Sequence, residues 1–106
     1  MALWAPDALV ELRLFPPDAG GRAGPTSTAW WGCPLSIDGE LFDGRFDLSE
    51  IEPLQPGESR VVPVKFLRPD LVEPRIAEGQ KLRVWEGRFI GEATVLSLYW
   101  LAATGD

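Results

Sequence analysis

The sequence contains no histidine and only one cysteine, Cys33. Histidine is the commonest metal ligand and the usual general base near neutral pH, so its absence argues against many hydrolases and metal centres. A single cysteine also excludes an intramolecular disulfide. We therefore expect no catalytic residues, no bound metal and no cofactor.

Long apolar segments are missing as well. The sequence has no run of about 18 uncharged apolar residues, which is roughly the length that a membrane-spanning helix needs. Residues 1–7 lack the basic start and apolar stretch of a secretory signal peptide. These absences predict a cytoplasmic protein with no membrane partner.

Basic residues are outnumbered by acidic ones. Ten Lys and Arg face 16 Asp and Glu, which gives a formal net charge of −6. A field of this sign repels polyanions, so binding of nucleic acid would need a local basic patch. The charge balance therefore disfavours a nucleic-acid partner.

Glycine and proline are abundant, and they divide the chain into short extended segments. With 106 residues, 11 Gly and 10 Pro, the composition fits one domain over residues 1–106, with a core at about 9–101. Alternating apolar and polar residues predict six antiparallel strands in a small all-β barrel or sandwich. The expected extended segments are 9–15, 29–41 with a turn at Asp38-Gly39, 41–48 with a break at Gly44, 60–67, and a hairpin over 80–95.

The connections carry their own signals. Residues 16–28 offer few apolar side chains to bury, so they predict a long loop or a partly disordered excursion. Residues 68–78 contain two prolines and predict a connection with at most one short helical turn. Pro34 and Pro63 fall inside expected strands, where proline indicates an edge or a bulge.

Five turn and strand motifs occur in an order that is similar to a known domain. They are Ala19-Gly20-Gly21-Arg22 with Pro25, Pro56-Gly57-Glu58, the strand from Val64 to Pro69, Glu78-Gly79, and Trp85 to Gly91. As a set they resemble the carboxy-terminal β-barrel, the third domain, of bacterial elongation factor Tu. The resemblance covers roughly residues 9–98 and implies a six-stranded antiparallel β-barrel that stands alone.

The resemblance also implies candidate contact residues, because that domain helps to hold aminoacyl-tRNA. The positions that fall on its tRNA-facing motifs are Gly20, Gly21 and Arg22 in the first loop and Glu86, Gly87 and Arg88 in the hairpin turn. The Gly-x-x-x-x-Gly-Lys-Ser/Thr loop that cradles phosphates is absent from the sequence. The resemblance therefore does not extend to a GTPase.

Three tryptophans, Trp30, Trp31 and Trp85, complete the candidate surface. Neighbouring strand residues point to opposite faces, so one of Trp30 and Trp31 must face the core and the other must face outward. Exposed tryptophans on this strand and at Trp85 would indicate a protein interface or a weak homodimer. The alternative is that the long loop over residues 16–28 folds over them.

The polar candidates also have two interpretations each. Arg22 and Arg88 are either anion ligands or solvated turn residues. Cys33 lacks an adjacent His or Lys, so a buried structural thiol is favoured over a reactive one. Glu86 and Glu92 are either an acid/base pair or two solvated carboxylates.

Together these observations predict a non-catalytic binding module whose partner is a protein. A translation-associated tRNA or RNA binder that uses Arg22 and Arg88 is the first alternative. An enzyme of unrecognised chemistry is the second.

Overall fold

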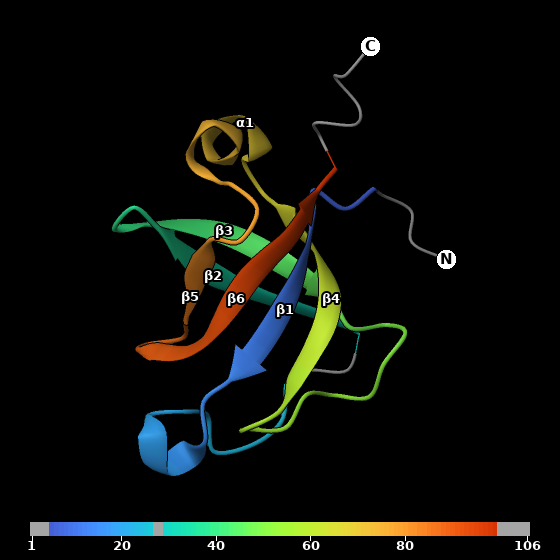
Figure 1. Cartoon of the computed structure of the whole chain (residues 1–106). Coiled ribbons are helices and arrows are strands. Elements are labelled where there is room, and N and C mark those ends of the chain that lie inside the picture. The colour runs from blue at the N-terminus through green and yellow to red at the C-terminus, as the bar shows by residue number, and fades with distance from the viewer. Residues whose placement is uncertain (1–4, 27–28, 100–106) are drawn as a thin grey trace.

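The computed structural model describes residues 5–26 and 29–99, which form a closed barrel of six antiparallel strands (Figure 1). Around the barrel the strands follow the order β1, β4, β3, β2, β5, β6, and β6 pairs again with β1. The predicted six-stranded antiparallel β-barrel is confirmed. The strands are β1 (Ala8–Leu14), β2 (Trp30–Ile37), β3 (Glu40–Asp47), β4 (Ser59–Phe66), β5 (Lys81–Trp85) and β6 (Phe89–Leu98).

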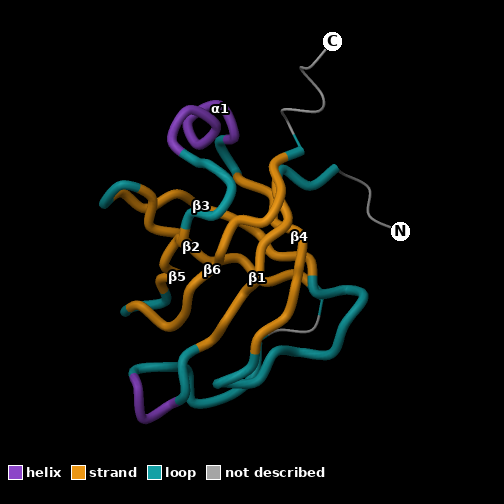
Figure 2. The backbone as a smooth tube through the Cα atoms, in the orientation of Figure 1, coloured by secondary structure: helices purple, strands orange, loops and turns teal. Residues whose placement is uncertain are grey.

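Three short helical segments lie outside the barrel wall. They are η1 (Pro17–Ala19), α1 (Pro69–Val72) and η2 (Glu73–Arg75). Figure 2 shows α1 near one end of the barrel and the segment that contains η1 at the other. The prediction of at most one helical turn over residues 68–78 was wrong, because α1 and η2 follow each other directly. Both prolines of this connection lie in first-turn positions, where the missing N–H leaves no hydrogen bond unmade.

The core follows from the alternation of apolar residues along the strands. Every second residue of β1 is fully buried, and β4 repeats the pattern from Val62 to Phe66. Burial of apolar side chains contributes roughly 25 cal/mol for each Å² removed from water, so this alternation is what holds the sheet in a closed form. The largest fully buried side chains are Phe46, Phe66, Leu12, Leu14, Leu35, Ile37, Leu48, Leu54, Leu82, Ile90, Val10 and Val62.

The β2–β3 hairpin has the tight turn that the sequence predicts. Asp38 and Gly39 both have positive φ, 53° and 82°, and Ile37 pairs directly with Glu40. A two-residue turn of this kind matches the right-handed twist of the flanking strands. The turn therefore fixes the register that continues along the full length of both strands.

Gly44 does not break its strand, which corrects the prediction. It lies inside β3, opposite Cys33 on β2 and Phe66 on β4. A Cβ atom at this position would lie 2.6 Å from Leu35 Cδ1. A side chain here would require Leu35 to move, so the glycine reflects the packing of the core and not a bend in the chain.

Pro34 and Pro63 lie in regularly paired stretches, so neither marks a bulge. Pro34 pairs with Asp43 on β3, and Pro63 pairs with Leu9 on β1. Each proline is outside the second ladder of its strand, because β2 pairs with β5 only at Leu35 and Ser36 and β4 pairs with β3 only from Val64 onward. The predicted edge character is therefore local to one side of each strand.

The loop predicted over residues 16–28 is described up to Thr26, and residues 27–28 lie outside the described part. Thr26 is buried, and its backbone N–H donates to the Leu54 carbonyl at 3.0 Å. In return the Leu54 N–H donates to Thr26 Oγ1 at 3.0 Å. These two bonds join the end of the described part of the loop to the segment between β3 and β4.

Candidate functional site

The first loop and the hairpin turn, which carry six of the predicted site residues, meet at one end of the barrel. Arg88 donates from Nε to the Gly20 carbonyl at 2.7 Å and from Nη2 to the Gly21 carbonyl at 2.8 Å. Arg22 Nε lies 3.0 Å from Glu86 Oε1. We call these contacts of Gly20, Gly21, Arg22, Glu86 and Arg88 the loop–hairpin clasp.

Gly21 determines how tightly the first loop folds back on the end of β1. Its N–H donates to the Pro16 carbonyl at 2.9 Å, and a Cβ atom on it would lie 1.8 Å from the Phe15 carbonyl oxygen. No side chain fits at that distance from backbone atoms. Gly21 is therefore a packing requirement of the loop that carries one half of the clasp.

Arg22 reaches from the loop over the end of the core. Its guanidinium carbon lies 5.6 Å from the centre of the Trp31 ring, a cation–π contact. Within residues 5–26 and 29–99, its Nη1 atom is buried without a hydrogen-bond partner. Arg22 thus covers the open end of the barrel, with Trp31 on one side and Glu86 on the other.

The three tryptophans have different environments. Trp31 faces inward, is 5% exposed and packs against Phe46 with ring centres 5.5 Å apart. It is therefore a core residue and not part of a binding surface, which corrects its place among the candidate residues. Trp85 is half-buried and meets the Phe89 ring edge-on at 5.1 Å. Trp30 faces outward and is 39% exposed. The predicted opposition of Trp30 and Trp31 is confirmed, and Trp30 is the most exposed tryptophan of the three.

Cys33 is a buried thiol without a disulfide partner. It is buried in the core, and burial raises its pKa from an ordinary value of 9.0 to about 12, with a further increase from the nearby Glu86 carboxylate and a smaller opposing effect from Arg22. A thiol with this pKa holds almost no thiolate at neutral pH. The environment of Cys33 therefore favours the structural interpretation.

The two carboxylates considered as an acid/base pair lie against different cations. Glu86 pairs with Arg22, and Glu92 lies 3.6 Å from Arg13 Nη1. Within the part of the chain that the structure describes, no group of three or more Cys, Asp or Glu residues is placed to hold a metal ion. None of the helices described is long and apolar enough to cross a membrane.

A groove on the outer face of β2, β3 and β4 was not predicted. It has a volume of about 480 Å³, and its lining includes the buried residues Cys33, Gly44 and Phe66. Its outward-facing residues alternate with these along the strands, which places the opening on the outside of the barrel. We call it the outer-face groove, and its outward-facing residues are Gly32, Pro34, Asp43, Arg45, Lys65 and Leu67.

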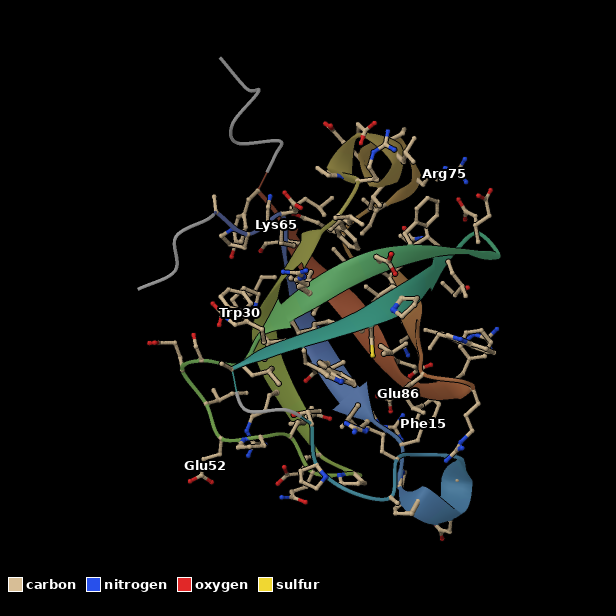
Figure 3. The ribbon with its side chains drawn as sticks, turned by 180° about the vertical axis from the view of Figure 1, so that it is seen from behind. Phe15, Trp30, Glu52, Lys65, Arg75 and Glu86 are labelled. Atoms are coloured by element: carbon tan, nitrogen blue, oxygen red, sulfur yellow. The ribbon has the colours of Figure 1, made fainter. Side chains whose placement is uncertain are left out.

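The strand register explains both the hollow and its charge. Arg45 on β3 lies opposite Gly32 on one side and opposite Lys65 on the other. Gly32 has no side chain, so the space beside Arg45 stays empty. Trp30 lies two residues before Gly32 on the same face of β2, and Figure 3 shows Trp30 and Lys65 on the same side of the barrel. Arg45 and Lys65 are far apart in sequence, and no local pattern links them.

No protein-family model matches the chain, and no curated protein matches it either. The resemblance to the third domain of elongation factor Tu stays a prediction from sequence motifs.

Proposed function

We propose that the chain is a non-catalytic, protein-binding β-barrel, similar in architecture to the third domain of elongation factor Tu. It binds its partner through the outer face of β2, β3 and β4. The observation that carries the proposal is the combination of exposed Trp30 with the outer-face groove on the same side of the barrel. Tryptophan is enriched among residues that dominate protein interfaces, and a concave surface beside it supplies complementarity.

Apolar exposure on these strands supports the same face. Leu67 at the rim of the groove is 67% exposed, the largest fraction among the exposed large apolar residues described. Leu41, two residues before Asp43 on the outer face of β3, is also exposed. Exposed apolar side chains are common singly, whereas a group beside a tryptophan and a groove is typical of an interaction surface.

The RNA-binding alternative is weaker because its two arginines are occupied within the fold. Arg88 bonds to two backbone carbonyls and Arg22 pairs with Glu86, so part of each guanidinium group is already used in contacts within the fold. The net charge of −6 opposes a polyanion as well. We therefore favour a protein partner over tRNA.

A photo-crosslinking amino acid tests the proposal. We would place it at Trp30 and, as the matched control, at Glu11 on β1, which is three strands away around the barrel in either direction. In lysate of the source cells, we expect a protein adduct from position 30 that resists ribonuclease and does not form from position 11. An adduct that disappears on ribonuclease treatment, or equal adducts from both positions, would contradict the proposal.

A further inference from the structure

Two cations lie side by side in the lining of the outer-face groove, in a protein that is acidic overall. Arg45 and Lys65 are directly paired residues of β3 and β4, and their side chains point outward. Like charges opposite each other on neighbouring strands destabilise the sheet, so the pairing opposes stability. Lys65 is balanced by Asp7, whose Oδ1 lies 3.7 Å from its Nζ.

Arg45 has no such balance. It is exposed, and within the described residues its guanidinium takes part in no hydrogen bond or ion pair. Most of the other arginines described have a partner, such as Arg75 with Glu40 at 2.9 Å and Arg68 with Asp70 at 2.8 Å. A guanidinium group has five N–H donors, two of which can bind the two oxygens of one carboxylate at the same time. Arg45 can therefore bind an external anion.

The surroundings of Arg45 fit a short peptide segment. The groove volume of about 480 Å³ is within the roughly 300–1,000 Å³ of typical ligand pockets, which is room for a few side chains. Pro34 and Leu67 form an apolar section of the groove lining, and Asp43 adds one negative charge to the same lining. A dense polyanion would meet that carboxylate as well as the net charge of the chain, whereas a single carboxylate can avoid it.

We infer that the outer-face groove binds an acidic segment of the partner protein. A Glu or Asp carboxylate of that segment pairs with Arg45, with Lys65 beside it, and a neighbouring apolar side chain packs on Pro34 and Leu67. This inference rests on the proposed function, because it names the chemistry of the partner at the same face. Charge complementarity argues for this occupant: among the described residues the Arg45 guanidinium has no anionic partner, and the groove lining holds two cations, Arg45 and Lys65, against one carboxylate, Asp43.

Selection from a random dodecapeptide library displayed on phage tests the inference. The full chain, its Arg45→Glu variant and its Lys81→Glu variant are used in parallel. Lys81 is the matched control because it is an exposed cation on the outer face of β5, outside the groove lining. We expect peptides that combine Asp or Glu with an adjacent large apolar residue, and affinity that falls on the order of tenfold or more in Arg45→Glu. Lys81→Glu should bind like the unmodified chain.

The outcomes separate this inference from the proposed function. Enriched peptides without acidic residues, no enriched peptide, or equal loss in both variants would overturn the acidic partner. If crosslinking from Trp30 still captures a protein and Arg45→Glu leaves that capture unchanged, the proposed protein-binding function is supported and the inference of an acidic segment is wrong. Retention of a single-stranded RNA oligonucleotide that is lost in Arg45→Glu would assign the groove to nucleic acid and overturn the inference.

Discussion

Arg22 and Glu86 form an ion pair, with Nε and Oε1 3.0 Å apart, between the first long loop and the turn of the last hairpin. An arginine that the sequence motifs associate with anion binding is therefore used to close one end of the barrel. Arg88 also joins the hairpin turn to the first loop, by donating hydrogen bonds to the carbonyls of Gly20 and Gly21. The clasp acts as a structural element, and its energetics are open to direct measurement.

Replacing Arg88 by alanine should lower the free energy of unfolding by about 1–2 kcal/mol. The change removes two hydrogen bonds from a charged donor, and each bond of this kind contributes roughly 1.5–3 kcal/mol before the partial exposure of the site is discounted. Arg88→Lys should recover less than half, because an ammonium group cannot make the same forked contact with two carbonyls. Urea unfolding measures both.

The control for Arg88 is Lys81→Ala, a surface change on β5 that should alter stability by no more than about 0.5 kcal/mol. If Arg88→Ala is as mild as this control, the clasp makes no net contribution to stability. Binding through Arg88 would then become a better explanation for its position.

Gly21→Ala should destabilise the protein by about 3 kcal/mol or more. The new methyl group would lie 1.8 Å from the Phe15 carbonyl oxygen and 2.6 Å from its carbon, and backbone atoms cannot move aside cheaply. Gly24→Ala in the same loop is the matched control, since a Cβ there meets nothing within 4 Å. We expect that change to be neutral, or stabilising by a few tenths of a kcal/mol through the unfolded state. Thermal unfolding of both variants, followed by circular dichroism, checks the contrast, and equal effects would refute it.

Stability should fall at alkaline pH through Cys33. Its pKa is raised from 9.0 to about 12 in the folded protein, so between these values the unfolded chain loses the proton and the folded one keeps it. The contribution is fully present below pH 9 and decreases by about 1.4 kcal/mol for each pH unit above it, which amounts to about 2 kcal/mol at pH 10.5.

Urea unfolding of the unmodified protein and of Cys33→Ala, at pH 8 and pH 10.5 with a reductant present, isolates this effect. The difference in stability between the two proteins should shift by the stated amount in favour of the variant at the higher pH. Other titrating groups cancel in that difference. An unchanged difference would mean that the folded thiol ionises as easily as the unfolded one.

Arg45→Glu should leave the fold intact and raise its stability by about 0.2–1 kcal/mol. The substitution places a carboxylate opposite Lys65 and converts a repulsive cross-strand pair into an attractive one. The gain should disappear in a Lys65→Ala background, which a double-mutant cycle by urea unfolding measures. A destabilised Arg45→Glu protein would show that Arg45 has a structural role that its contacts do not reveal.

Local signals predicted most of the fold. Asp38-Gly39 specifies its turn because few other residue pairs accept two positive φ angles, and the alternation of Val62, Val64 and Phe66 specifies the inward face of β4. Gly44 was misjudged because a glycine that bends a strand and one that makes room for Leu35 look identical in sequence. The prediction therefore failed where the reason lay on another strand.

The site was predicted less well, and for the same reason. Gly20, Gly21, Arg22, Glu86 and Arg88 do come together, but as partners of one another. Arg45 and Lys65 share a groove only because β3 pairs with β4 in one particular register. A strand shifted by one residue would point one of these side chains into the core, and the sequence of either strand alone does not contain that information.

The first and last strands of the barrel are neighbours, and the Tyr99 N–H donates to the Asp7 carbonyl at 2.9 Å. The described chain thus enters and leaves the barrel at a single point. A barrel with this connectivity can be circularly permuted. A short linker would join the two present ends, and new ends would be opened at the exposed Asp38-Gly39 turn. Every strand pair would be kept, and only the covalent connection between β2 and β3 would be lost. The same property suits it to insertion into a loop of another protein, where it would present β2, β3 and β4 without disturbing its host.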